Sequence, residues 1–94
     1  MSSNEGGIAA VADGILAAYQ DGMYSSDAAL DLLADEVVAV ELSDPEGIEH
    51  ARGILHHLAS EDIADDEGFP EDLTAMVSSR AASATDRARK RAGR

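Results

Sequence analysis

The chain has 94 residues, of which 19 are acidic and seven are basic, so its formal net charge is -12. This length allows one domain at most, and the absence of cysteine excludes a disulfide scaffold and any thiolate metal site. The acidic balance argues against a compact basic nucleic-acid-binding domain, and the lack of a long apolar run or a positively charged leader predicts a cytoplasmic protein without a membrane segment.

The first predicted helix covers about residues 7–20. Its large apolar side chains recur along one helical face, at Ile8, Val11, Ile15 and Tyr19. Asn4 or Ser3 is the expected N-cap. Gly22 stands where a left-handed residue would end the helix.

The second predicted helix covers about residues 27–40, with Ser25 or Ser26 as its N-cap. Its apolar stripe consists of Leu30, Leu33, Val37 and Val40, and we expect Leu32 and Val38 to widen it. The β-branched run over residues 37–40 is also compatible with a short strand. Helix is favoured because the acidic residues of this segment keep helical spacing.

The third predicted helix begins at residues 43–46, where Ser43 and Glu46 have the spacing of a capping box around Pro45. Its predicted buried stripe is Ile48, Ala51, Leu55 and Leu58. Gly53 has two interpretations: it weakens the helix, or it permits the close approach of a neighbouring helix.

Residues 61–72 are rich in carboxylates and are predicted to form an acidic loop that ends at residues 68–70. Phe69, which precedes Pro70, is expected to staple the start of the next helix. An EF-hand alignment of this segment fails, because Ile63 falls at the first ligand position. The candidate partner-binding residues are Asp62, Asp65, Asp66, Glu67, Glu71 and Asp72.

The fourth predicted helix starts near Pro70, and after Val77 only alanines continue its apolar stripe, at Ala81, Ala84 and Ala88. Residues 1–79 carry 18 acids and one base, whereas residues 80–94 carry six bases and one acid. We therefore divide the chain into an acidic helical domain over 1–79 and a basic C-terminal extension over 80–94. The basic residues of this extension are Arg80, Arg87, Arg89, Lys90, Arg91 and Arg94.

The basic extension has three interpretations. It can complement the negative end of its own helix dipole. It can lie on the acidic loop of a second copy, which would make a homo-oligomer. It can bind nucleic acid, although it lacks interleaved aromatic residues and the acidic body would repel the same ligand.

No arrangement of residues typical of an enzyme is present. His50 and His57 lie two helical turns apart, about 10.5 Å, with no ligand between them, so they and His56 are expected to be surface residues. The serines lack a nucleophile motif, and no glycine-rich phosphate loop occurs. We predict no catalytic residues, no metal and no cofactor.

These patterns predict an all-α protein, a small bundle of three to four helices with an Arg/Ala-rich C-terminal helical extension. Its acidic surface can be merely solvated, as in proteins from salt-loving hosts, or can bind a basic partner. We expect a non-enzymatic interaction module, acting as a regulator, inhibitor or accessory subunit that binds a basic protein surface. The alternatives are a nucleic-acid-associated packaging factor that acts through the basic extension, and a DNA-mimic inhibitor of a nucleic-acid enzyme.

Overall fold

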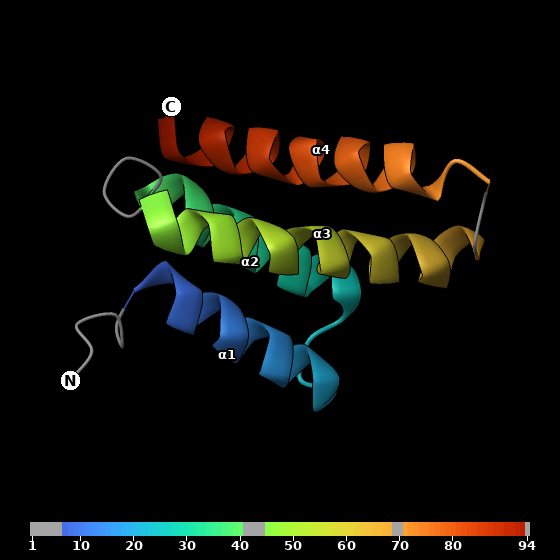
Figure 1. The fold of residues 1–94 in the computed structure, drawn as a ribbon, viewed down its shortest axis with the longest axis horizontal. Helices are drawn as coiled ribbons and strands as arrows, with labels where there is room; N and C mark the ends of the chain where they lie inside the picture. Colours follow the sequence, from blue (N-terminus) through green and yellow to red (C-terminus); the bar gives the residue numbers. More distant parts are fainter. Residues whose placement is uncertain (1–6, 41–44, 69–70, 94) are drawn as a thin grey trace.

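The computed structural model of the chain describes residues 7–40, 45–68 and 71–93, apart from the side chain of Glu67. Within these ranges the chain forms helices α1 (Ile8–Gln20), α2 (Ser26–Val40), α3 (Pro45–Glu67) and α4 (Leu73–Gly93), and no strand. Successive helices reverse direction, so α2 and α4 run the same way (Figure 1). The predicted all-α bundle is confirmed, and the strand alternative for residues 37–40 is wrong.

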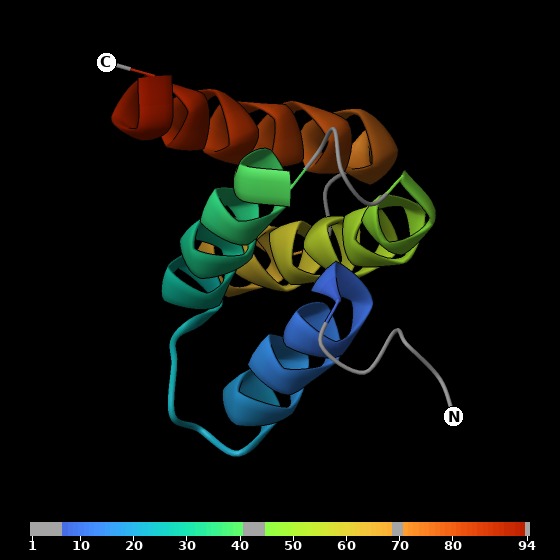
Figure 2. The same ribbon diagram turned by 90° about the vertical axis from the view of Figure 1, so that its left-hand side faces the viewer.

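Helices α2 and α3 form the centre of the bundle. Helix α1 packs against both of them, α4 packs against both from another side, and the described parts of α1 and α4 do not touch each other (Figure 2). The largest fully buried side chains come from the two central helices, and they are Leu30, Leu33, Leu58 and Ile63. The core is therefore built around the α2–α3 pair.

The predicted apolar stripes of the two central helices are confirmed in the main. The buried residues of α2 include Leu30, Leu33 and Val37, and all four predicted positions of α3 are buried. The expectation for Leu32 is wrong, since 39% of it is exposed. Leu32 lies two residues, or about 200° of helical turn, from Leu30 and therefore points away from the core.

Two predicted helix ends are confirmed by their hydrogen bonds. After α1, Gly22 has a φ of 86° and its amide donates to the Tyr19 carbonyl, while the Met23 amide donates to the Ala18 carbonyl. This pair of bonds is a Schellman motif. Before α2, the Ser25 hydroxyl accepts a bond from the Ala28 amide at 3.4 Å, as an N-cap does.

The capping and staple residues predicted for the starts of the other three helices are not found in the described chain. Helix α1 has Gly7 as its N-cap, without a side-chain hydrogen bond, so the expectation of Asn4 or Ser3 is wrong. Both of those residues lie outside the described ranges, as do Ser43 of the predicted capping box and the predicted staple residue Phe69. Pro45 occupies the first position of α3, where a missing amide hydrogen costs nothing.

The prediction of an acidic loop over residues 61–72 is wrong for its first seven residues, which continue α3 to Glu67. The continuation is explained by Ile63, which is fully buried and extends the stripe of Leu55 and Ala59 by one more turn. The helix ends at Gly68, which has a φ of 79° and whose amide donates to the Ala64 carbonyl at 3.1 Å.

Helix α4 runs without interruption through the predicted domain boundary at residues 79 and 80. Ala81, Ala84 and Ala88 are buried, as the stripe predicts. No helix in the described ranges is at once long enough and apolar enough to cross a membrane.

Gly53 does not mediate a close contact, because no atom of another helix described in the structure lies within 4 Å of where its Cβ would be. Of its two interpretations, only the weakening of α3 by a flexible residue remains.

Candidate partner-binding site

Eight of the chain's 19 acidic residues stand, with described side chains, on the segments that lie toward one end of the bundle. Because successive helices reverse direction, the turn between α1 and α2 and the start of α4 lie toward this end, on either side of the last turns of α3 (Figure 1). We call this region the acidic end; its described side chains are Asp21, Asp27, Glu61, Asp62, Asp65, Asp66, Glu71 and Asp72, together with the base Arg80. The sequence predicts the acids of residues 61–72 as a group, but only the topology adds those of the α1–α2 turn.

Residues on both sides of the α1–α2 turn form hydrogen bonds with α3. The Tyr19 hydroxyl donates to Glu61 Oε1 at 3.1 Å. The Ser26 hydroxyl lies within hydrogen-bond distance of two carboxylates, 3.0 Å from Asp62 Oδ1 and 3.2 Å from Asp65 Oδ2. Ser26 is buried, so these bonds satisfy a hydroxyl that has no access to water. Sequence reasoning missed them because Ser26 was considered as a cap.

Arg80 neutralises part of this end. Its guanidinium donates to Asp62 Oδ2 at 2.7 Å and to Asp66 Oδ2 at 3.1 Å. The bond to Asp62 raises the pKa of Arg80 above its ordinary value, although partial burial opposes the shift. Only 14% of the Asp62 side chain is exposed. Asp62 is therefore a structural ion-pair partner in this chain and is poorly placed to meet another molecule.

The remaining predicted partner-binding residues are more accessible. Asp65 and Asp66 are exposed in addition to their bonds with Ser26 and Arg80. Glu71 and Asp72 are exposed, and their carboxylates bond to no described group. Glu67 is the last residue of α3, but its side chain lies outside the described part of the chain. The strongest candidates for outside contact are thus Asp65, Asp66, Glu71 and Asp72.

The basic residues of α4 form a matched row against α2. Arg87 contacts Asp31 at 2.9 Å and Arg91 contacts Asp35 at 2.7 Å, so two pairs with i, i+4 spacing meet between α4 and α2. Lys90 lies 3.9 Å from Asp86 of its own helix. Arg89 faces the hollow between α3 and α4, and Arg94 lies outside the described ranges. Arg87 and Arg91 thus form ion pairs with acids of their own chain. The sequence analysis did not predict this pairing.

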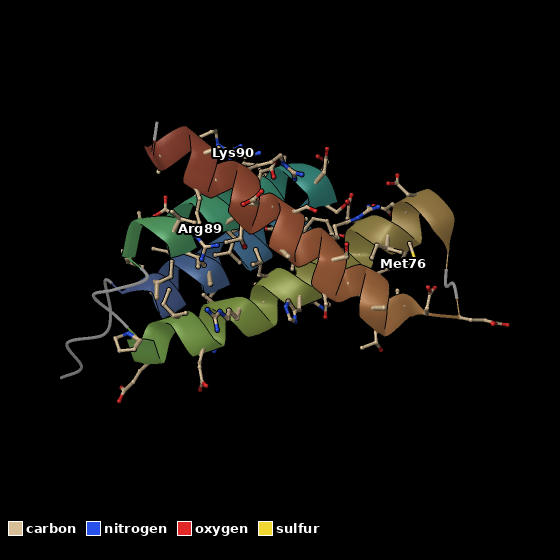
Figure 3. All side chains as sticks on the ribbon, turned by 90° about the horizontal axis from the view of Figure 1, so that it is seen from above. Met76, Arg89 and Lys90 are labelled. Atoms are coloured by element: carbon tan, nitrogen blue, oxygen red, sulfur yellow. The ribbon has the colours of Figure 1, made fainter. Side chains whose placement is uncertain are left out.

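The histidines and the largest described groove complete the inventory of polar side chains outside the acidic end. They contain no group of three or more acidic or histidine residues placed to hold a metal ion. His50 bonds to Asp13 at 2.8 Å, which joins α3 to α1 at an exposed position. An open groove of about 400 Å³ lies between α4 and the other two helices that it contacts, and Met76 of α4 lines it (Figure 3). Of its charged lining groups, Arg80 is bonded to Asp62 within the groove, whereas Arg87 is bonded to Asp31 and Asp27 to Ser25. The acidic end can therefore supply charge and hydrogen-bond acceptors to a partner.

The hydrogen bond between Tyr19 and Glu61 predicts a dependence on alkaline pH. Burial, then the bond to Glu61, raises the pKa of Tyr19 above its ordinary value of about 10. Folding thus favours the neutral phenol, and this stabilisation is complete below pH 10 and is lost as the pH rises through the pKa of the folded state. In the variant Tyr24→Phe, Tyr19 is the sole tyrosine, and its ultraviolet absorbance should titrate with a midpoint above about 10. Adding Glu61→Gln should lower that midpoint, whereas an unchanged midpoint would contradict the role of Glu61.

Comparison of the chain with protein-family models, with curated proteins and with solved structures finds no match.

Proposed function

We propose that the protein is a non-enzymatic interaction module whose acidic end binds a basic surface of another protein. The observation that carries this proposal is that eight described acids and one arginine stand on segments that lie toward one end of a four-helix bundle (Figure 1). Like charges gathered on one end of a small domain repel one another. A basic partner would relieve the repulsion, and its affinity would fall steeply with added salt.

The helical frame supports this proposal by limiting the entropy lost on binding. Asp65 and Asp66 stand on α3, which the bonds of Tyr19, Ser26 and Arg80 hold in place. Carboxylates on a fixed helix lose less freedom on binding than those of a loose loop. A regulator, an inhibitor and an accessory subunit, including an inhibitor that imitates the charge of DNA, all use this chemistry and differ in the identity of their target.

The alternative function, nucleic-acid binding through the basic extension, has weaker support. Arg80, Arg87 and Arg91 already bond to carboxylates of α2 and α3. A phosphate backbone would have to displace those carboxylates before it could use the same guanidinium groups. Nucleic acid would also approach a body whose net charge is strongly negative.

The test is affinity capture from host lysate with the full chain as bait, at low and high salt and after nuclease treatment. A truncation after residue 79 is unsuitable because it cuts α4 and removes Arg80. The informative bait is instead the triple variant Asp21→Asn, Glu71→Gln, Asp72→Asn, whose residues are exposed. Asparagine also remains a good N-cap at the residue before α4. We expect the wild type to retain a discrete protein at low salt and the triple variant to lose most of it.

A matched control carries Glu36→Gln, Glu46→Gln and Glu49→Gln, which removes the same charge from exposed positions remote from the acidic end. The control should retain the partner as the wild type does. Equal losses in both triple variants would mean that binding follows net charge alone, and the acids would then be a solvated surface. Loss of the captured protein after nuclease treatment would favour the nucleic-acid alternative.

A further inference from the structure

Two exposed apolar side chains stand next to each other in the α1–α2 turn, which comprises residues 21–25. Among the described residues, the large apolar side chains that are exposed are Met23, Tyr24 and Leu32, so two of the three are consecutive. Met23 is 72% exposed and Tyr24 is 37% exposed. The turn lies at the outer edge of the bundle, on the far side from α4 (Figure 2).

The exposure of Met23 is not explained by the way in which α1 ends. The Met23 amide closes the Schellman motif by donating to the Ala18 carbonyl. A hydrophobic residue at this position of the motif frequently packs against the last turns of its helix. Most of Met23 is exposed instead, so its apolar surface contributes little to the stability of the free chain.

Hydrogen bonds hold the backbone on both sides of these two residues. Before them, the Gly22 amide donates to the Tyr19 carbonyl at 3.0 Å. After them, the Ala29 amide donates to the Ser25 carbonyl at 2.9 Å as α2 begins. Side chains on a backbone that is already ordered lose less conformational freedom on binding. The turn therefore presents a preformed apolar pair to the solvent.

Carboxylates flank this apolar pair along the chain and approach it from α3. Asp21 and Asp27 stand on either side of it in the sequence, and both are exposed. On α3, Glu61 and Asp65 accept the hydrogen bonds that come from the two sides of the turn. A molecule that packs on the apolar pair thus meets negative charge around it, and positive charge at its rim favours binding.

We infer that the α1–α2 turn binds a segment of another protein in which large apolar residues are flanked on both sides by lysine or arginine. This inference rests on the proposed function and adds to it the chemistry of the partner. Methionine adapts its shape to an irregular apolar surface. The ring of Tyr24 offers apolar area and a face on which a guanidinium group can stack. Methionine and tyrosine are both enriched in protein interfaces.

A second copy of the chain fits the turn less well than such a segment. Arg80, Arg87 and Arg91 of each copy already bond to carboxylates of their own chain. The approach of two copies through this turn would also bring two acidic ends together, and like charges repel.

The experiment is an NMR titration of the full chain with two synthetic peptides of equal charge, at constant ionic strength. Each peptide has blocked ends and two lysines on either side of a central pair, which is leucine in one peptide and serine in the other. The leucine peptide should bind about tenfold more tightly, because its central pair buries apolar surface on the turn. It should also shift the methyl signal of Met23, which the variant Met23→Gln identifies among the three methionines of the chain.

Matched variants locate the contact. Met23→Gln keeps an unbranched side chain at a highly exposed position, so it should leave the fold unchanged. It should weaken binding of the leucine peptide by about fivefold and leave binding of the serine peptide within about twofold. Tyr24→Gln should act in the same direction. Leu32→Gln is the control, because it removes an exposed apolar side chain from α2 outside the turn, and it should change either affinity by less than about twofold.

The outcomes separate this inference from the proposed function. Equal affinities for the two peptides, or equal losses in Met23→Gln and Leu32→Gln, would overturn the inference and leave the acidic end as an electrostatic surface. Failure of both peptides to bind would overturn both proposals. Light scattering that shows a dimer in the wild type and a monomer in Met23→Gln would assign the turn to a second copy. Binding to phosphatidylcholine vesicles that Met23→Gln abolishes would assign it to a lipid surface, and either result would overturn the protein segment as its occupant.

Discussion

Replacing Arg80 by glutamine is expected to lower the free energy of unfolding by about 1–3 kcal/mol. Arg80 joins α4 to α3 through Asp62 at 2.7 Å and Asp66 at 3.1 Å. Asp62 is mostly buried and shares the Ser26 hydroxyl with Asp65. Without the guanidinium, a largely buried carboxylate is left next to like charges with only a neutral donor. Urea unfolding followed by circular dichroism at fixed salt measures the loss.

Two comparisons isolate the cause of this loss. Arg91→Gln removes the same charge from the same helix, but both members of its pair with Asp35 are about half exposed, so it should cost less than about 1 kcal/mol. Combining Arg80→Gln with Asp62→Asn removes the uncompensated charge and should recover part of the stability. Equal losses for Arg80→Gln and Arg91→Gln would show that the Arg80 pairs contribute no more than a surface ion pair.

The parts of the fold that were predictable are those decided within one or two helical turns. The stripe of Leu30, Leu33 and Val37 marks the buried face of α2 by spacing alone. Ser25 and Gly22 cap helices through bonds to residues three or four positions away. The alanine stripe of α4 was visible for the same reason. Such features need no knowledge of which helix packs against which.

The error at residues 61–67 has a tertiary cause. Their composition resembles a solvated loop, but Ile63 is fully buried and the neighbouring acids receive donors from remote parts of the chain. The Tyr19 hydroxyl reaches across 42 positions to Glu61, and the Ser26 hydroxyl across 36 positions to Asp62. Neither bond has a local signature, so the sequence could mark these residues as acidic but could not show that they are helical.

The pairing of α4 with α2 was hidden for a related reason. Arg87 and Arg91 have the same i, i+4 spacing as Asp31 and Asp35, and this match is the one signal in the sequence that pointed to it. Its meaning depends on α2 and α4 being neighbours that point the same general way, which follows from the packing of all four helices (Figure 1). The extension over residues 80–94 was therefore set apart by its charge, whereas its first 14 residues complete a helix of the bundle.

Replacing Ala84 by leucine should destabilise the protein by about 1–3 kcal/mol and loosen the second half of α4. Ala81, Ala84 and Ala88 are the buried residues of this helix, and Ala84 is fully buried in the core cluster. The partly exposed large apolar residues, including Met76 and Val77, lie in its first turns. The C-terminal half is thus held by close contact of small side chains, which a larger side chain prevents, and by ion pairs whose geometry depends on that contact.

Ala75→Leu makes the same chemical change at an exposed position of the same helix. Alanine and leucine have similar helix propensities, so this control should remain within about 0.5 kcal/mol of the wild type. Hydrogen exchange adds a local readout, since Ala84→Leu should speed exchange of the amides of residues 80–93 more than those of α3. Suppose instead that Ala84→Leu were as stable as Ala75→Leu, with unchanged exchange. The contact of α4 with the core around Ala84 would then accommodate a leucine side chain. The row of arginines would then be what holds α4 in place, and the cost of Arg80→Gln would be correspondingly larger.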